Sequence, residues 1–589
     1  MTPSTRSASA SFSAAEPRYP ILQKPGGDAI ALGLAVLVVG GLCLMPLARL
    51  VVEALAPAGA LDLETAERVL ARASTWRATW RTLEVGFLSM LFSLALGLLM
   101  ALLVGASDVR GKAAIVFAFM LPLMIPPQIT ALAWMQLTGA SSPLLKSLGV
   151  APAPGTPNPL YSREGLILLM GIQHAPLVFI TVAASLRRMS MELLDAAFLA
   201  GAGRLEAIRF VILPLLAPAL VAGGALAFVS AIGNFGIAAM IGIPARYTLL
   251  PVLIYERLAS FGPTVLAEVA VLAIIVGSLA LLGVLLQRWL RARRDVTLEG
   301  LGGRPLVLPL GPWRPAAEAV AWLLLSVILV LPLLALLAAA LTPAAGVRLT
   351  PETLTFANFH QVMFVQDVTR RAFANSTMLA GAAALILALL AIPLAYLIAW
   401  RPSRLTAALD TLAELPYALP GVVLAVAFIM LFLQPLPLLG VSLYGTHAII
   451  LLAYLAAFLT LALRPTLAGM AQLAPAIDEA AQLDGAGLAQ RLRWILVPLV
   501  GPMAAAGGIL VFMTAFNELT VSALLWAHGT ETLGVVVFNL NDSGYTALAA
   551  SVACLAVLAI LALMTLAQWL DRRSGLGILP WSTAAGRGD

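Results

Sequence analysis

The sequence has few charged residues for its length. Only 11% of its 589 residues are Asp, Glu, Lys or Arg, against roughly 25% in a typical soluble domain. Hydrophobic residues make up 61% of the chain, and the mean hydropathy is +0.98. One soluble core cannot bury that much apolar surface, so much of it must face lipid. The composition therefore excludes a soluble enzyme, a nucleic-acid-binding protein and a disordered chain.

Groups that bind metals or nucleotides are also scarce. The two cysteines, Cys43 and Cys554, lie far apart in apolar segments, and we expect two buried hydrophobic residues instead of a disulfide. The four histidines are too few and too scattered for a metal cluster. The only Gly-Lys pair, Gly111-Lys112, lacks the glycine five residues earlier that a phosphate-binding loop needs. We expect no catalytic site, no metal and no cofactor bound by this chain.

Long apolar runs recur along the sequence and predict transmembrane helices, because ~20 helical residues cross the hydrocarbon core. Within lipid, a helix pairs all of its own backbone polar groups. The predicted fold class is therefore an all-α polytopic membrane protein. We predict about twelve spans, at 29–52, 83–106, 113–137, 165–186, 211–233, 265–287, 316–341, 377–400, 410–434, 447–467, 496–526 and 546–570.

The basic residues predict the orientation of these spans. With the N-terminus in the cytoplasm, cytoplasmic segments hold 23 of the 35 Lys and Arg residues and the opposite side holds 11. Positive charge favours the cytoplasmic side, so we expect both termini there. The apolar run from residue 29 is too long for a signal-peptide core and should remain as a span. Residues 1–27, rich in Ser, Ala and Pro, are expected to form a disordered cytoplasmic tail.

The sequence repeats itself internally. Asp195-Ala-Ala, Gly201 and Pro214 are matched by Glu479-Ala-Ala, Gly485 and Pro498 at an offset of 284 residues. Upstream, Leu121-Pro122-x3-Pro126 is matched by Leu415-Pro416-x3-Pro420 at an offset of 294. A repeat of this length indicates two homologous halves. Six spans in each half make the repeats parallel. The predicted parts are a first half at 28–287, a cytoplasmic linker at 288–315, a second half at 316–572 and a cytoplasmic tail at 573–589.

The repeated segment lies between the fourth and fifth span of each half, at about 187–214 and 469–498. Ala197 and Gly201 are four residues apart and share one helical face, and the second copy keeps this spacing. Small residues there let a partner surface approach the backbone closely. Gly201 permits a sharp turn, and Pro214 suits the first turn of the next helix. The pattern predicts two helix–turn–helix elbows that project into the cytoplasm.

These loops resemble the signature Glu-Ala-Ala-x3-Gly-x9-Ile-x-Leu-Pro of permease subunits of binding-protein-dependent ABC importers. The first copy departs at Asp195 and Val211 and the second at Val497. The resemblance covers about 80–290 and 370–572, and it implies the type I importer permease fold. Packing of the elbows within the protein is the alternative. By resemblance, the residues that couple to the ATPase are Asp195, Ala196, Ala197, Gly201, Pro214, Glu479, Ala480, Ala481, Gly485 and Pro498.

The same resemblance implies the partners and the location. Two copies of an ATP-binding cassette subunit would bind the elbows on the cytoplasmic side and would hold ATP and Mg. A periplasmic or extracellular solute-binding protein would deliver the substrate. The chain itself would be a transport subunit of the bacterial inner membrane, surrounded by lipid, with no enzymatic activity and no nucleic-acid partner.

Polar residues inside the spans are candidates for the transport path, because they are costly in lipid. Asn234 and Glu518 are separated by the repeat offset of 284, and Asn517 precedes Glu518. We predict that these three line the outer pore or gate; interhelical hydrogen bonds between the halves are an equal alternative. Gln173 and His174 are further path candidates, and a buried histidine of the helix bundle is the alternative there.

The substrate is suggested by resemblance alone. Two permease halves fused in one chain resemble the ferric-iron and thiamine permeases. Gly242-Ile-Pro-Ala-Arg-Tyr247 and Phe516-Asn-Glu-Leu-Thr-Val-Ser522 resemble the ferric-iron branch. Thiamine, a polyamine, a phosphonate or another small solute remain open. A twelve-span secondary transporter with parallel halves is the alternative of another class, although a loop like that family's motif, at 105–112, has no counterpart in the second half.

Overall fold

The computed structural model describes residues 26–57, 59, 61–292, 304, 306–435 and 440–574. The predicted terminal tails lie almost wholly outside these residues, and so does much of the predicted linker. The described residues form helices, with one isolated bridge between Ser107 and Leu308. Ten described helices are long and apolar enough to cross a membrane, or up to twelve if each of two bent pairs forms one span. The prediction of an all-α polytopic protein is confirmed.

The first half runs from α1 to α14. Its helices are α1 (Gly26–Val39), α2 (Met45–Leu55), α3 (Glu64–Ala71), α4 (Ala73–Gly105), α5 (Lys112–Met124), α6 (Pro127–Thr138), α7 (Pro143–Ser147), α8 (Arg163–Leu186), α9 (Glu192–Leu199), α10 (Arg204–Ala207), α11 (Leu213–Ile232), α12 (Phe235–Gly242), α13 (Leu250–Leu258) and α14 (Val265–Ala292).

The second half repeats this order, apart from the short α7. Its helices are α15 (Arg314–Leu325), α16 (Leu331–Ala340), α17 (Ala357–His360), α18 (Asp367–Trp400), α19 (Arg404–Ala418), α20 (Gly421–Phe432), α21 (His447–Met470), α22 (Ala476–Leu483), α23 (Leu488–Arg491), α24 (Val497–Phe516), α25 (Ser522–Leu525), α26 (Leu533–Asp542) and α27 (Thr546–Ser574).

Two predicted spans are broken in the structure. The spans expected at 113–137 and 410–434 are the bent pairs α5–α6 and α19–α20, with bends of 103° and 109°. Each of these spans was predicted as one helical run, and the structure divides each into two helices. Pro126 and Pro420 stand at the bends, and a proline supplies no N–H to continue the helix. The span expected at 496–526 also ends earlier, because α24 stops at Phe516.

Pro214 and Pro498 lie in the first turn of α11 and α24, as predicted, but these helices continue from earlier ones. The apolar helices that contain Pro214 and Pro498 begin about ten residues earlier, at Arg204 and Leu488. A π-helical turn precedes each proline, in which Leu213 N donates to Ile208 O, five residues back. A proline ring clashes with the carbonyl four residues before it, and the wider turn keeps the helix continuous. Each elbow is therefore built into the same helix as α11 or α24.

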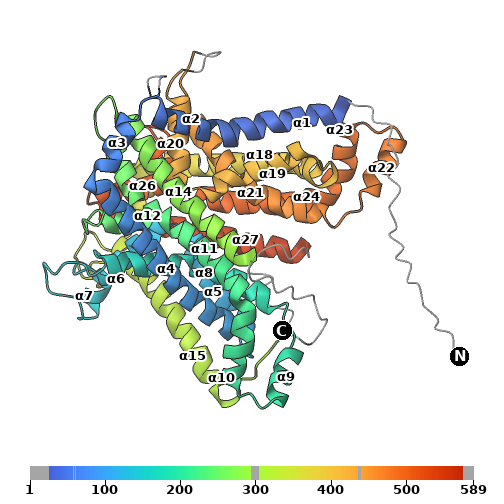
Figure 1. The fold of residues 1–589 in the computed structure, drawn as a ribbon. Helices are drawn as coiled ribbons and strands as arrows, with labels where there is room; N and C mark the ends of the chain where they lie inside the picture. The colour runs from blue at the N-terminus through green and yellow to red at the C-terminus, as the bar shows by residue number, and fades with distance from the viewer. Residues whose placement is uncertain are drawn as a thin grey trace.

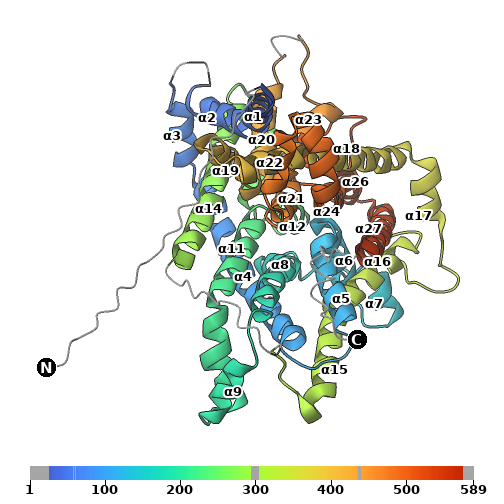
Figure 2. The same cartoon turned by 90° about the vertical axis from the view of Figure 1, so that its right-hand side faces the viewer.

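The first span of each half packs against the other half. The α1–α2 segment lies along α18, α19 and α20, while α15 and α16 lie along α5 and α6. Figure 1 shows α1 running beside α18, and Figure 2 shows α15 next to α5. Asp28 of α1 contacts Arg401 at the end of α18, and Glu318 of α15 accepts from the backbone of Arg110. The two sequence halves are thus interlocked in space.

Candidate functional site

The two elbows have the same backbone geometry. Gly201 and Gly485 adopt φ of +89° and +84°, a left-handed conformation that only glycine adopts without strain. In the first elbow, Gly201 N donates to Phe198 O and Ala202 N donates to Ala197 O, each at 3.0 Å. The second elbow repeats both bonds. This pair of bonds is a Schellman motif, which ends α9 and α22 and starts the turn.

Five side chains anchor the second elbow to the membrane helices. Arg491 Nη1 lies 2.8 Å from Asp478 Oδ1, and Arg491 Nη2 lies 2.9 Å from Asp28 Oδ1. Arg401 pairs with the same two carboxylates at 2.9 Å each. Tyr396 OH accepts from Arg491 Nη1 at 2.8 Å. Asp478 and Arg491 are almost fully buried, and two arginines against two aspartates leave this charge cluster formally neutral.

The first elbow is held in a different way. The repeat counterparts of Asp478 and Arg491 are Leu194 and Ala207, both buried and apolar. Instead, Arg304 Nη2 lies 3.0 Å from Asp195 Oδ2, and Met191 N donates to Arg304 O at 2.9 Å. Arg304 belongs to the predicted linker, so the connection between the halves fastens the first elbow.

The exposed carboxylates of the first elbow also contact this linker residue. Arg304 N donates to Glu192 Oε1 at 3.2 Å. The backbone N–H of Glu192, the Ser190 hydroxyl and the Arg304 N–H together hold the pKa of Glu192 below its usual range. In the second elbow the predicted acid, Glu479, is exposed. The two motif acids, Asp195 and Glu479, therefore have different surroundings in spite of their equivalent positions.

Sequence reasoning missed the most exposed apolar side chains of the elbows. Leu199 and Leu483 are 89% and 86% exposed and are repeat counterparts, each two residues before the turn glycine. Phe210 and Trp494 form a second such pair and are also exposed. Exposed apolar residues that recur in two equivalent places are candidates for contact with a partner or, for the pair inside the apolar helices, with lipid. The repeat offset of 284 would have revealed both pairs.

Three of the five predicted path residues, Asn234, Asn517 and Glu518, lie where α11 and α24 end. Ile237 N donates to Asn234 Oδ1 at 3.0 Å, which caps α12. In the second half Val521 N and Ser522 N donate to the two oxygens of Glu518, at 2.6 and 3.0 Å. Counterpart residues thus cap the next short helix in each half. Asn517 Nδ2 donates to Met124 O at 2.9 Å and joins α24 to α5 across the two halves.

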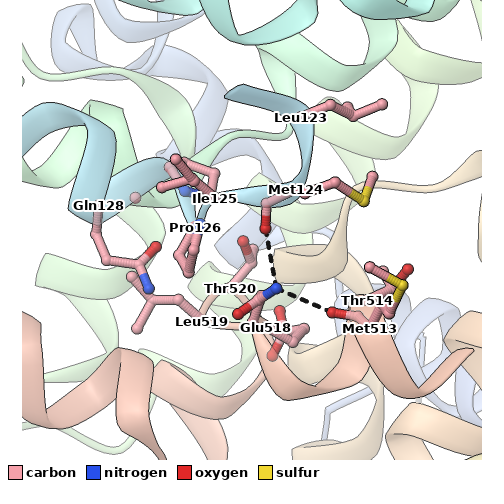
Figure 3. Close-up of a pocket in the computed structure, with 13 residues that line it drawn as sticks. Leu123, Met124, Ile125, Pro126, Gln128, Met513, Thr514, Glu518, Leu519 and Thr520 are labelled. Atoms are coloured by element: carbon pink, nitrogen blue, oxygen red, sulfur yellow. Dashed lines mark hydrogen bonds between the residues drawn. The ribbon is translucent and has the colours of Figure 1, made fainter. Parts of the chain in front are cut away.

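A cavity of about 180 Å³ lies at this junction, between the α5–α6 bend and the end of α24. Figure 3 shows that residues from both segments converge on it. Its polar lining residues are Gln128, Thr514, Asn517, Glu518 and Thr520. Two of the five predicted path residues, Asn517 and Glu518, therefore line one cavity together. Asn234 lies at the corresponding junction of the other half.

Gln173 and His174 do not line this cavity. Gln173 Nε2 donates to Pro122 O and, at 3.1 Å, to Ile125 O. Pro126 has no N–H for the Pro122 carbonyl, so the amide replaces the missing helical bond. His174 is buried in α8 at 5% exposure. In this structure Gln173 stabilises the bend, which the sequence pattern did not reveal.

Neither the elbows nor the cavity forms a metal centre. Within the described part of the chain, no group of three or more His, Cys, Asp or Glu side chains is placed to hold a metal ion. Cys43 and Cys554 are both buried and free. The arrangement offers two exposed elbows, at α9–α10 and α22–α23, which lie apart in Figure 1, and a small polar cavity between the halves.

Comparisons with known proteins agree with the repeat. The family model described as "Binding-protein-dependent transport system inner membrane component" matches residues 88–296 and again 391–575. The chain is 27% identical over 512 residues to "Probable ABC transporter permease protein y4fN" of Sinorhizobium fredii, covering 84% of this chain and 87% of that one.

Two further relatives carry substrate names. The chain is 24% identical over 463 residues to "Fe(3+)-transport system permease protein FbpB 2" of Haemophilus influenzae, covering 77% of this chain and 82% of the relative. It is 32% identical over 233 residues to "Putative 2-aminoethylphosphonate transport system permease protein PhnU" of Salmonella typhimurium. That match covers 38% of this chain and 79% of the relative.

Proposed function

Since this chain belongs to the family of binding-protein-dependent transport system inner membrane components, we propose that it carries ferric iron across the bacterial inner membrane. The family match to both halves makes the chain an ABC importer permease with two fused permease domains. The secondary-transporter alternative has no such support. Ferric iron is favoured because the ferric permease relative is similar over 77% of this chain, whereas the phosphonate relative is similar over 38%.

The observation that carries the mechanism is the continuity of each elbow with a membrane helix. The helices from Arg204 to Ile232 and from Leu488 to Phe516 each have 29 residues, which corresponds to about 43 Å. One end of each helix follows the turn glycine, and the other end lies beside Asn234 or Asn517. A movement imposed at an elbow is therefore transmitted along one element to the junction of the halves.

We infer that two copies of an ATP-binding cassette subunit hold the elbows from the cytoplasm, with both termini on that side. The exposed pairs Leu199 and Leu483, and Phe210 and Trp494, supply the apolar contact. When ATP closes the subunit pair, the elbows approach each other, and α11 and α24 alternate the access of the central path. The partner subunit binds ATP and Mg, whereas this chain contributes the transport path and the helices α11 and α24 that connect it to the elbows.

A pull-down of the tagged chain from mildly solubilised native membranes, with mass spectrometry of the partners, tests this proposal. An ATP-binding subunit and a solute-binding protein that retains Fe³⁺ are the expected partners. A chain that purifies alone and transports in liposomes on an ion gradient without ATP would overturn the importer mechanism. A binding protein that retains thiamine, a polyamine or a phosphonate would overturn ferric iron and leave the importer mechanism intact.

A further inference from the structure

The cavity between the α5–α6 bend and the end of α24 is large enough for a small solute. A site needs only ~10–15 Å³ to hold one water molecule, and this one offers about 180 Å³. It lies at the far end of the 29-residue helix that begins at Leu488, about 43 Å from the elbow, and both halves line it. This is the location expected of a site within the transport path.

The lining is rich in hydrogen-bond acceptors and contains no basic residue. Glu518 is its one titratable side chain, so the wall is negative or neutral at every pH. Asn517 uses its amide N–H groups on Met124 O and Met513 O, which leaves Oδ1 available as an acceptor. Thr514 donates its hydroxyl proton to Leu510 O and keeps its lone pairs. Such a lining attracts a cation and has no positively charged side chain to bind a phosphonate.

Gln128 is the least satisfied side chain of this lining. It is 0% exposed, and neither Nε2 nor Oε1 has a hydrogen-bond partner. An unpartnered buried polar group costs ~1–3 kcal/mol, so two such atoms on one residue need an explanation. Gln128 lines the cavity beside Leu519 (Figure 3). Its amide atoms are closed off from the open space of the cavity and face Gly236 and Gly534. The acceptors open to a solute are therefore those of Asn517, Glu518 and Thr514.

The corresponding place in the other half is filled. The counterparts of Gln128 and Asn517 are Val422 and Gly233. A Cβ atom built on Gly233 would lie 3.0 Å from Pro420 Cβ, so the α11 end packs directly on the α19–α20 bend. The polar groups are therefore concentrated at one junction, although the backbone repeats at both. Helix packing alone does not require this difference.

We propose that this cavity is a binding site within the membrane for a small cation that keeps most of its own water shell. The inference rests on the proposed function, because the site would receive the solute released by the binding protein. One carboxylate and several neutral oxygens do not replace a full coordination sphere, in agreement with the lack of grouped metal ligands among the described residues. The site selects for positive charge and against oxyanions.

The test uses the full-length chain alone in phosphatidylcholine nanodiscs and Tb³⁺, a hard trivalent cation whose luminescence lifetime reports bound water. Tb³⁺ is expected to bind with most of its water retained. Glu518→Gln keeps an acceptor for the α25 backbone and removes the charge, so the Kd for Tb³⁺ should rise about tenfold or more. Glu164→Gln is the matched control, because it removes the charge of an exposed carboxylate paired with Arg163 outside the cavity and should leave the Kd unchanged.

A second variant separates binding from folding. Gln128→Val introduces the residue found at the second-half counterpart, and it should raise the melting temperature because unpartnered polar atoms are removed, while the Kd for Tb³⁺ stays unchanged because the amide has no surface open to the cavity. Spermidine and thiamine test organic cations as competitors, and 2-aminoethylphosphonate tests the anion. If Tb³⁺ binding is insensitive to Glu518→Gln, or if 2-aminoethylphosphonate alone shows Glu518-dependent binding, the cation site is wrong.

This design separates the two proposals. The binding measurement needs no partner, whereas the importer mechanism is judged by co-purification of the ATP-binding subunit. A chain that recruits the subunit and binds no cation at Glu518 would refute the cavity site alone. A chain that purifies without any such subunit would refute the importer mechanism, whatever the Tb³⁺ result.

Discussion

Asp28, near the start of the first described helix, lies 2.9 Å from Arg491 of the second elbow, although 463 residues separate them. Arg491 also holds Asp478 of the same elbow, and Arg401 holds both aspartates. The N-terminal helix of one half is thus fastened to the elbow of the other. A movement of the second elbow must either carry α1 with it or break this pair.

Loss of the Asp28 charge should destabilise the protein. In Asp28→Asn the neutral cluster gains one net positive charge around Arg491, which is 5% exposed. The Asp28 side chain is 33% exposed, so the cost should lie between the ~0.2–1 kcal/mol of an exposed ion pair and the ~3–5 kcal/mol of a fully buried one. A lower melting temperature in detergent is the expected result. The double variant Asp28→Asn/Arg401→Gln restores neutrality and should recover part of the loss. Asp367→Asn, at an exposed ion pair with Arg370, is the control and should have little effect.

Substitution of Gly485 should act through the backbone. No atom lies within 4 Å of a Cβ built there, but φ is +84°. Gly485→Val should reshape the turn at a cost of ~1–2 kcal/mol or more. The variant should then fail to recruit the ATP-binding subunit and to transport, while it still inserts into the membrane. Gly485→Asn tolerates positive φ and should retain more activity. Gly201→Val, where φ is +89°, should have the same effects as Gly485→Val. Normal substrate-stimulated transport in both valine variants would contradict the proposed role of the turns.

A charge on the exposed elbow leucines should remove the partner without unfolding the protein. Leu199→Asp and Leu483→Asp change side chains that are 89% and 86% exposed, and exposed substitutions rarely shift stability by more than ~0.5 kcal/mol. We expect an unchanged melting temperature and loss of the co-purifying ATP-binding subunit. Leu148→Asp, exposed near α7, is the control and should keep the partner. Retention of the subunit by both elbow variants would count against these contacts.

The Arg304 side chain should contribute little to stability. Arg304 is largely exposed and Asp195 is partly exposed, and ion pairs open to solvent contribute ~0.2–1 kcal/mol. The bond from Met191 N to Arg304 O uses the backbone and survives in Arg304→Gln. Hydrogen exchange of α9 should therefore accelerate only slightly, and that of α22 should not change. A large loss of protection in α9 would mean that the side chain, and not the backbone, holds the first elbow.

Gln173→Ala should destabilise the bend of the third span. The substitution removes the donor to the carbonyls of Pro122 and Ile125. An unpartnered buried carbonyl costs ~1–3 kcal/mol, so the melting temperature should fall. Gln173→Met keeps the side-chain volume but has no hydrogen-bond donor, so its melting temperature should fall by a similar amount. If the methionine variant is as stable as the native chain, packing and not hydrogen bonding explains the position.

Local signals in the sequence predicted the class of fold and the elbows. Apolar run length is a local property, because a helix in lipid satisfies its own backbone within each span. The spacing of Ala197, Gly201 and their counterparts likewise specified a turn within a few residues. The resemblance built on this spacing led to the family that the comparisons later confirmed.

Only the tertiary structure decided where the elbows are anchored and where the polar residues meet. The pairing of Asp28 with Arg491 depends on the first span crossing to the other half, which no local pattern encodes. The sequence placed Gln173 and Glu518 in one group of path candidates. Packing places them at different sites. Gln173 donates to backbone carbonyls at the Pro126 bend, while Glu518 lines the cavity. Spacing along one helix determines which side chains share a face, whereas contacts between distant helices depend on how the whole chain packs.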